Sequence, residues 1–385
     1  MKTMNVAIIG TKFMGRAHSN AWLNAPRFFD MGIKPVLKVA CGRKENDLRA
    51  FAERWGWQDT ETDWRKVVER DDVDIVDISV PTHLHHAIAV AAAKAGKHIF
   101  CEKPFAVSVQ EAQEMYETAE AAGVVHYVNH NYRRCPAVRL AKRLIDEGNV
   151  GRVFHWRGAY LQDWIVDPDF PLTWHLRSET AGSGPHGDLN SHSIDLARYL
   201  VGDIKSVSAM MTTFIKERPL PGEGAATFSA GEGGATEMGP VTCEDASFML
   251  AEFESGALGT FEATRFAPGR KNYNYFEIYG DKGSIVFNLE RMNELQFFRR
   301  DDPAYAQGFR TIIATEGDEH DYVANWWPPG HIIGYEHEFH HAVVDFMEAI
   351  EDGTSIEPNF YDGVKEMEVL AAGQQSAETG QRVEL

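Results

Sequence analysis

An aspartate and a histidine four residues apart are the side chains of this sequence best suited to chemistry. Asp188 and His192 follow a glycine-rich segment and open a helical pattern. Residues four apart in a helix lie on one face, about one turn apart. His192 suits a general base because an unperturbed imidazole titrates near neutral pH. The pair therefore predicts that Asp188 orients or polarises a substrate group while His192 accepts a proton.

Two other interpretations of this pair stay open. In the first, Asp188 caps the helix and His192 is a buried side chain held by Asp195, one turn further on. In the second, Asp188 and His192 bind zinc, and His186 is near enough in sequence to serve as a third ligand. We expect no metal, because no dedicated third ligand is evident.

A lysine at the end of a predicted strand is the second candidate. Glu102-Lys103-Pro104 follows the apolar run Ile99-Phe100-Cys101. In open α/β sheets, ligands bind at the carboxyl edge, where such a strand ends. There Lys103 would point a cation at a substrate hydroxyl and stabilise a developing alkoxide. Taken alone, a strand-ending lysine is more often solvated.

A glycine turn near the N-terminus predicts a dinucleotide site. Residues 6–17, VAIIGTKFMGRA, have the pattern of a strand, a turn and a helix start. Gly10 permits the tight turn and Gly15 lets the helix pack close to the strand, while amides of the helix N-terminus meet the pyrophosphate. Phe13 and Met14 belong to this predicted site. Lys12 replaces the usual middle glycine, and it either reaches a phosphate or points to solvent.

The end of the second predicted strand governs the choice between NAD and NADP. Val39-Ala40-Cys41 is followed by Gly42-Arg43-Lys44. An acid at this place binds the ribose hydroxyls of NAD, whereas an arginine accommodates the phosphate of NADP. Because there is no acid, the sequence favours NADP slightly, although Arg43 could equally stack on the adenine of NAD. We expect NAD or NADP, with Gly42 and Arg43 in the site.

Two kinds of architecture must position these residues. The first third of the chain alternates short β-branched runs with helical patterns, which is typical of βαβ units and a parallel sheet. Ser108 and Glu111 have capping-box spacing at the start of the last of these helices. The predicted strands are 5–9, 35–41, 74–78, 97–101 and 124–128, and the predicted helices are 17–24, 45–54, 83–95 and 109–122.

After a helix predicted at 137–147, strand-like segments follow one another. They are 153–161, 204–214, 246–253, 257–265, 273–279 and 283–288; a loop is predicted at 220–239 and helices at 336–350 and 361–379. Such a run of strands predicts an open, mostly antiparallel sheet. The predicted fold class is therefore α/β, with a doubly wound Rossmann domain at 1–132 and an α+β substrate and oligomerisation domain at 133–385.

Composition excludes several classes of partner. The 385 residues are 44% hydrophobic and 25% charged, as in ordinary globular proteins. The formal net charge of -19, without long basic runs, disfavours nucleic acid and anionic membranes as partners. Val6 to Ile9 is too short for a signal peptide, and no stretch approaches the roughly 18 apolar residues of a membrane span. We expect a cytoplasmic protein.

Taken together, the motifs resemble those of the glucose-fructose oxidoreductase and inositol dehydrogenase (Gfo/Idh/MocA) family. They are the glycine turn, Val80-Pro81-Thr82-His83-Leu84-His85, Cys101-Glu102-Lys103-Pro104, Asn131-Tyr132-Arg133-Arg134 and Gly187-Asp188 to His192, in family order along nearly the whole chain. The resemblance implies that Lys103, Asp188 and His192 are the catalytic trio. It also implies that Pro81, His85, Glu102 and Lys103 line the nicotinamide. Thr82, which stands where asparagine is common in the family, and Asn131 are expected in the cofactor site as well. Family members commonly form dimers or tetramers through the open faces of their C-terminal sheets, so we expect a homodimer or homotetramer.

Within the family, three segments are most similar to levoglucosan and glycoside 3-dehydrogenase-like members. They are Leu161-Gln162-Asp163-Trp164, Trp174-His175 and the segment 326–331. Five of the nine tryptophans lie between Trp156 and Trp327, where the substrate domain is expected. Aromatic faces suit the C–H faces of a pyranose, and polar groups bind its hydroxyls, although some of these tryptophans could be core or oligomer contacts. The expected substrate residues are Lys103, Tyr132, Arg133, Gln162, Trp164, Trp174, His175, Asp188, His192 and His331.

The sequence thus predicts an NAD(P)-dependent dehydrogenase that oxidises a secondary hydroxyl of a cyclic sugar, anhydrosugar, glycoside or inositol to the ketone. The cofactor carries the hydride, while the protein supplies orientation and charge. Two alternatives stay open: a regulator that senses nucleotide without catalysis, and a glycosidase that oxidises transiently with retained NAD. A regulator has no need of a proton acceptor, so the trio argues against it.

Overall fold

The computed structural model describes residues 2–221, 237–317 and 322–385. The chain divides into two compact units, Met1–Cys135 with Thr315–Met367, and Pro136–Ala314 with Glu368–Leu385. Most of the loop predicted at 220–239 lies outside the described residues. The domain boundary predicted after residue 132 stays a prediction, and residues 315–367 pack with the first unit.

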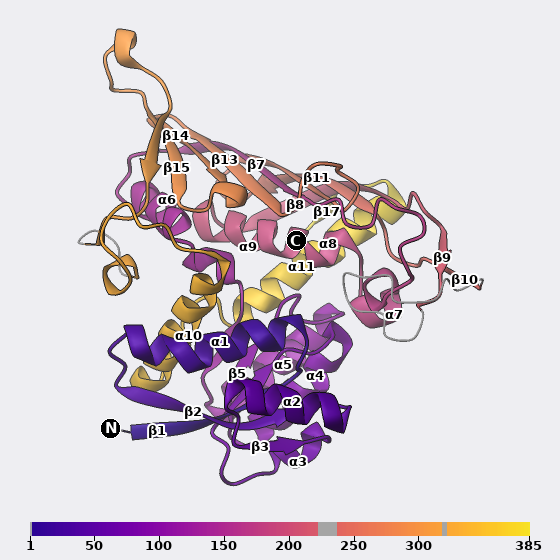
Figure 1. The fold of residues 1–385 in the computed structure, drawn as a ribbon. Coiled ribbons are helices and arrows are strands. Elements are labelled where there is room, and N and C mark those ends of the chain that lie inside the picture. The colour runs from indigo at the N-terminus through magenta and orange to yellow at the C-terminus, as the bar shows by residue number, and fades with distance from the viewer. Residues whose placement is uncertain (1, 222–236, 318–321) are drawn as a thin grey trace. The chain divides into compact units, whose positions relative to one another are not determined.

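The first unit is built on a parallel six-stranded sheet (Figure 1). Its order is β3-β2-β1-β4-β5-β6, with every neighbouring pair parallel. This order reverses direction between β1 and β4, which is where doubly wound sheets bind ligands. The strands are β1 (Lys2–Ile9), β2 (Ile33–Cys41), β3 (Asp59–Glu61), β4 (Ile75–Ile78), β5 (His98–Cys101) and β6 (His126–Val128).

Helices cover this sheet and bury its apolar strands. Helix α1 packs against β2 and α10, whereas α4 packs against β4 and β5 with α3 and α5 beside it. Trp22 of α1 and Phe346 of α10 belong to the same buried core as Phe100 of β5. The helices are α1 (Phe13–Phe28), α2 (Glu45–Trp55), α3 (Trp64–Val68), α4 (His85–Lys94), α5 (Val109–Ala122) and α10 (Tyr335–Asp352). The predicted cap of α5 is confirmed, because the Glu111 amide donates to Ser108 Oγ over 3.2 Å.

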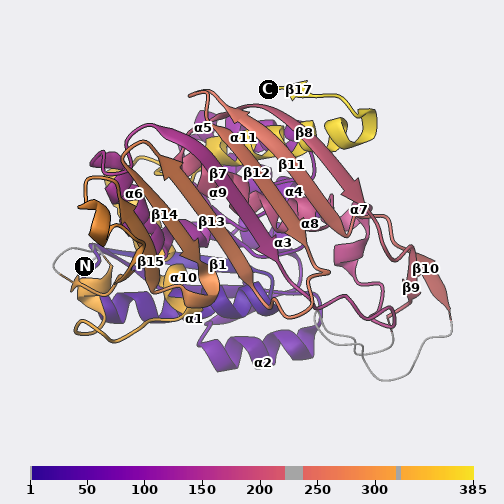
Figure 2. The same ribbon diagram turned by 90° about the horizontal axis from the view of Figure 1, so that it is seen from above.

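The second unit is built on a nine-stranded sheet, whose strands Figure 2 shows side by side. Its order is β16-β15-β14-β13-β7-β12-β11-β8-β17, and β7 with β12 is the parallel pair among otherwise antiparallel neighbours. The predicted fold class is therefore confirmed. The strands are β7 (Val153–Leu161), β8 (Ile204–Thr212), β11 (Ala246–Phe253), β12 (Leu258–Thr264), β13 (Tyr273–Gly280), β14 (Gly283–Asn288), β15 (Glu294–Arg299), β16 (Arg310–Ile313) and β17 (Val383–Glu384), and a separate hairpin pairs β9 (Glu217–Pro219) with β10 (Met238–Pro240).

Helices pack against one face of the nine-stranded sheet. Helix α9 contacts β7 and β12, α8 contacts β11 and β12, and α6 contacts β14 and β15. These helices are α6 (Pro136–Asp146), α7 (Ser178–Ala181), α8 (Pro185–Asp188) and α9 (Asn190–Leu200), and α11 (Phe360–Thr379) begins in the first unit and ends in the second. Within the described stretches of the chain, no helix combines the length and the apolar character that crossing a bilayer requires.

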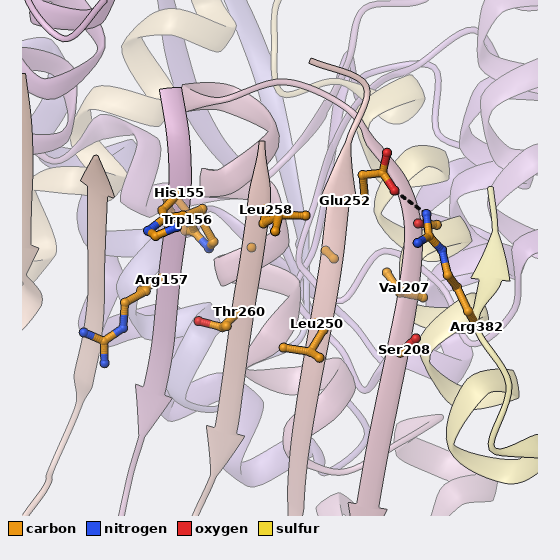
Figure 3. A pocket seen from close by; sticks show the side chains of 13 residues that line it. His155, Trp156, Arg157, Val207, Ser208, Leu250, Glu252, Leu258, Thr260 and Arg382 are labelled. Carbon is orange, nitrogen blue, oxygen red and sulfur yellow. Dashed lines mark hydrogen bonds and ion pairs between the residues drawn. The ribbon is translucent and has the colours of Figure 1, made fainter. Parts of the chain in front are cut away.

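The other face of this sheet carries exposed apolar side chains. Met210, Phe248, Leu250 and Leu258 are each at least half exposed, and strand pairing places them on the same face of β8, β11 and β12. Figure 3 shows the shallow hollow over these strands, where Glu252 forms an ion pair with Arg382. On the neighbouring strands, Arg157 donates to Glu277 over 2.9 Å. This open face thus carries an apolar patch on β8, β11 and β12 with an ion pair on either side of it.

Candidate active site

The first glycine turn packs its backbone tightly against the neighbouring loop and the start of α1. Gly10 follows β1 with φ +118°, a conformation that favours glycine, and its amide donates to the Cys41 carbonyl over 3.0 Å. A Cβ at Gly10 would lie 2.2 Å from the carbonyl oxygen of Ser79, and one at Gly15 would lie 2.1 Å from the oxygen of Gly10. Only glycine fits either place, at the reversal point between β1 and β4. The turn therefore fits a dinucleotide pyrophosphate.

The residues between the two glycines start helix α1. Phe13 is 47% exposed and its ring stacks on Tyr335, while Met14 is half-buried. Lys12 is exposed, and its Nζ lies 3.7 Å from Oδ2 of Asp47 on α2. An exposed pair of this kind contributes little, so Asp47 leaves Lys12 available to a phosphate.

The end of β2 holds the residues expected to discriminate between cofactors. Gly42 packs close to Thr11, since a Cβ there would lie 3.2 Å from that side chain. Arg43 is exposed on the loop that leads into α2. The structure thus places Arg43 just after β2, beside the strand that leads into the Gly10 turn. The adenosine is expected at this edge of the sheet.

His85 contacts both of the loops that follow β4 and β5. Pro81 and the buried Thr82 lead into His85 at the start of α4. The ring of His85 contacts the carbonyl of Phe105 through Nδ1 at 3.2 Å and that of Val80 through Nε2 at 2.9 Å. Burial lowers the pKa of His85 below its usual value, and the two contacts place its ring between the loops that follow β4 and β5.

A buried charged cluster lies directly beneath Lys103. Glu102 Oε1 accepts from His18 Nε2 over 3.0 Å and from Asn129 Nδ2 over 2.6 Å, while Oε2 accepts from the Lys103 amide over 3.2 Å. Burial alone would raise the pKa of Glu102, but His18 and Lys103 outweigh it and lower that pKa. The carboxylate of Glu102 therefore holds the strand end that carries Lys103, which is half-buried. Sequence reasoning did not single out His18 or Asn129.

The segment 131–134 makes internal contacts. Asn131 Nδ2 donates to Oε2 of Glu338 on α10 over 2.7 Å, and Tyr132 is buried. Arg133 is buried and its guanidinium donates to Asp362 over 3.3 Å and to Glu357 over 3.4 Å. These partners show that the segment holds α10 and the start of α11 in the first unit. The ligand contacts expected of Asn131, Tyr132 and Arg133 stay predictions.

In the second unit, Asp188 ends α8 and His192 lies in the first turn of α9, with Leu189 between the two helices. The alternative in which Asp188 caps the helix is wrong, because Leu189 occupies the cap position without a side-chain hydrogen bond. Instead, Asp188 Oδ2 accepts from Nη2 of Arg265 in an ion pair. Arg265 was not predicted, although the strand that precedes it was. His192 is buried, with 4% of its surface exposed.

Both ring nitrogens of His186 contact other residues of the second unit. Its Nδ1 lies 3.0 Å from Ser247 Oγ. Its Nε2 lies 2.8 Å from the carbonyl oxygen of Leu370, and because this oxygen can only accept, Nε2 carries the proton. Burial lowers the pKa of His186, as expected for a neutral ring. Both nitrogens are thus occupied, and His186 is not a third ligand beside Asp188 and His192. In the described part of the chain, no group of three metal-ligating side chains is assembled.

The predicted substrate residues of the second unit form one connected network. The rings of His192 and Tyr160 are 5.7 Å apart, and Tyr160 Oη donates to Asn272 Oδ1 over 2.6 Å. The same Oδ1 accepts from Gln162 over 3.0 Å, and Trp164 Nε1 donates to Gln162 over 2.7 Å. Tyr160 and Asn272 were missed because a tyrosine inside a strand and an asparagine beside one carry no spacing signal.

Aromatic rings extend this network. The rings of Trp164 and His175 are 5.8 Å apart, and those of His175 and Trp174 are 3.7 Å apart. Trp174 is 36% exposed, so it can offer a face to a ligand. The structure thus joins His192, Gln162, Trp164, His175 and Trp174 through continuous contacts within one unit.

Two of the five tryptophans in the predicted substrate region are core residues. Trp156 stacks on Phe276 inside the second unit, and Trp326 lies in the core of the first unit against Phe28. His331 belongs to the first unit, where it is exposed and contacts the carbonyl of Pro328 over 2.9 Å. The segment 326–331 therefore packs with the cofactor-binding unit.

Comparison with known proteins matches both halves of the chain to one family. Residues 4–130 match the family model described as an oxidoreductase family with an NAD-binding Rossmann fold, and residues 138–286 match the GFO/IDH/MocA C-terminal domain. Levoglucosan dehydrogenase of Pseudarthrobacter phenanthrenivorans is 45% identical over 365 residues, which cover 94% of this chain and 93% of that protein.

Solved structures agree along the full length. An oxidoreductase domain protein from Kribbella flavida is 48% identical with a TM-score of 0.94, and levoglucosan dehydrogenase in complex with NADH and levoglucosan is 42% identical with a TM-score of 0.93. Each alignment covers 100% of this chain and 99% of the other. Of the two expected cofactors, NAD is the one named by the family model and held by that complex. The chain therefore belongs to the GFO/IDH/MocA family of NAD-dependent oxidoreductases.

Proposed function

We propose that this protein is a sugar dehydrogenase that oxidises a secondary hydroxyl of a cyclic anhydrosugar to the ketone, with levoglucosan as its substrate. The observation that carries the proposal is the full-length similarity to levoglucosan dehydrogenase. The connected network of aromatic and polar side chains in the second unit supports it, because such a set suits a ring with several hydroxyls.

NAD, when bound, supplies the hydride acceptor. Gly10, Gly15, Phe13 and Met14 hold its pyrophosphate at the start of α1, with Lys12 at a phosphate. Gly42 and Arg43 flank the adenosine, and Pro81, Thr82, His85, Glu102 and Asn131 frame the nicotinamide end. The two glycines support this assignment most strongly, since any side chain at either position would occupy the space of the turn.

Three side chains act on the substrate alcohol. His192 accepts the proton of the hydroxyl, Lys103 stabilises the oxygen with its ammonium group, and Asp188 positions the hydroxyl. Two features support these roles: Glu102 fixes the backbone that carries Lys103, and Arg265 fixes Asp188.

The remaining predicted residues bind the sugar ring. Trp164 and Trp174 pack against its C–H faces, and Gln162 and His175 hydrogen-bond to its hydroxyls. Tyr132, Arg133, Lys103 and His331 complete the proposed set from the first unit.

The open face of the nine-stranded sheet is proposed as the surface through which copies of the chain form a dimer or tetramer. Met210, Phe248, Leu250 and Leu258 expose a continuous apolar area there, which soluble monomers rarely do. The adjacent pair of Arg157 and Glu277 supplies charges of both signs, as a self-complementary contact requires.

A substrate screen tests the proposal. The purified protein is mixed with NAD or NADP and with levoglucosan, a methyl glucoside, myo-inositol or the open-chain polyol sorbitol, and nicotinamide reduction is followed by absorbance. We expect reduction of NAD with levoglucosan at a kcat/KM at least about tenfold above that with inositol or sorbitol. Binding of NAD without reduction by any cyclic sugar would instead indicate a regulator. Cleavage of the glucoside without net reduction would indicate a glycosidase.

A further inference from the structure

A buried arginine lies behind the predicted substrate residues of the second unit. Arg265 directly follows β12, and its side chain is fully buried. Its Nη2 donates to Oδ2 of Asp188, whose side chain is 30% exposed. The ion pair therefore has a buried cation and a carboxylate that a ligand can still reach.

The same guanidinium contacts the aromatic part of the network. Its Cζ lies 5.1 Å from the ring centroid of Trp164, within the range of a cation–π interaction. Trp164 in turn donates to Gln162. Arg265 thus contacts Asp188 and Trp164 directly and reaches Gln162 through one further hydrogen bond.

Asp188 is the carboxylate that compensates the charge of Arg265. Among the residues that the structure describes, neither Nε nor Nη1 of Arg265 has a hydrogen-bond acceptor. Asp245 also lies near this guanidinium, but its Oδ2 accepts from the backbone amides of Phe214 and Ile215, and burial raises the pKa of Asp245. Removing Asp188 alone would leave the buried guanidinium of Arg265 without this carboxylate.

We propose that Arg265 is a positioning residue that acts through Asp188, holding this carboxylate ionised and in one orientation toward the substrate hydroxyl. The inference rests on the proposed function, because Asp188 must itself contact the substrate. A lysine at this position would keep the charge but lose the planar fork that fixes the carboxylate.

A double-mutant cycle on the full chain tests the inference. kcat and KM for levoglucosan are measured for Arg265→Met, Asp188→Asn and the double variant, with NADH affinity measured by fluorescence. If Arg265 acts through Asp188, each single variant loses about tenfold or more in kcat/KM, and the double variant is no worse than Asp188→Asn by more than about threefold. NADH affinity stays within about threefold of the wild type throughout.

The pH profile separates positioning from a purely structural role. Removing the charge of Arg265 favours protonation of Asp188, so the acid limb of the kcat/KM profile of Arg265→Met, which titration of His192 also shapes, moves to higher pH. Arg265→Lys restores the acid limb and part of the rate. This variant also keeps the inference testable if Arg265→Met does not fold.

Arg218 provides the matched control. It is a second fully buried arginine of the same unit, but its guanidinium donates to the backbone carbonyls of Ile165, Asp167 and Phe170. The losses from Arg218→Met and Asp188→Asn should therefore multiply, and Arg218→Met should keep the wild-type acid limb.

The outcomes distinguish the two proposals. If Asp188→Asn keeps near-normal kcat/KM, the role of Asp188 in the proposed function is wrong. If Asp188→Asn loses activity while Arg265→Met stays within about twofold of the wild type, or if their losses multiply, the inference about Arg265 is wrong and the proposed function stands.

Discussion

The buried imidazolium of His18 in the first unit makes the stability of the folded protein depend on pH in the alkaline range. His18 is 1% exposed, and its Nδ1 lies 2.8 Å from Asp77 while its Nε2 lies 3.0 Å from Glu102. Trp22 also donates to Asp77, over 2.6 Å. Burial alone would lower the pKa of His18, but attraction and hydrogen bonds from the two carboxylates outweigh it and raise that pKa to about 10.

The direction of the pH dependence follows from the two states. The pKa of His18 is about 6.5 in the unfolded chain and about 10 in the folded one. Because the folded value is higher, the contribution of His18 is fully present below about pH 6.5 and is lost as the pH rises toward 10. Between about pH 7 and pH 9 the loss amounts to ~2–3 kcal/mol.

Urea unfolding of the wild type and of His18→Gln at these two pH values measures this loss. We expect the wild type to lose ~2–3 kcal/mol more than the variant over the interval. Near pH 7 the variant should be destabilised by about 3–5 kcal/mol, because Asp77 and Glu102 lose their cation.

His126 is the control for this measurement. It is equally buried, but burial lowers the pKa of His126, so this ring adds no stability that is lost between about pH 7 and pH 9. His126→Gln should therefore keep the wild-type pH dependence. The same pH dependence in the wild type and in His18→Gln would refute the buried imidazolium.

Three further predictions concern the cofactor turn, the acid limb of stability and the open sheet face. Gly10→Ala should weaken NADH binding, followed by fluorescence, by at least about tenfold, because its Cβ meets the Ser79 carbonyl. Gly96 also has a positive φ but open space around it, so Gly96→Ala should leave binding unchanged. Burial lowers the pKa of His340 to about 4, so the free energy of unfolding should fall by ~3 kcal/mol as the pH drops from about 6.5 toward 4. In urea unfolding, His340→Gln should reduce this dependence of the free energy on pH. Leu250→Glu should shift the molar mass measured by light scattering toward that of the monomer. Tyr305 is 93% exposed, and Tyr305→Glu should leave the mass unchanged. An unchanged mass for Leu250→Glu would exclude the open face as the interface.

Periodicity and turn chemistry were enough to predict most of the fold. The runs at 153–161, 246–253 and 283–288 are strands with those bounds, because each alternates or clusters apolar residues between turn residues. β3 was missed because its three residues are polar, and α3 because five residues are too few to show a helical period. No local pattern indicates that α10 packs with the first unit, because an apolar stripe shows that a helix is buried without showing against which partner.

The candidate site was predictable where spacing carries information. The glycine turn, the strand-ending Lys103 and the pair Asp188 and His192 each have a local signature. The groups that hold them have none. His18 contacts Glu102 across 84 residues and Arg265 contacts Asp188 across 77, so only the folded chain reveals either partner.

Lys103 and His192 are proposed to perform the charge and proton chemistry of the alcohol oxidation. Single-turnover reduction of NAD by levoglucosan, measured for Lys103→Met and His192→Ala with NADH affinity determined in parallel, tests it most directly. We predict that both variants lose roughly 10²-fold or more in rate while NADH affinity stays within a few-fold of the wild type. Near-normal rates in both variants would contradict the account.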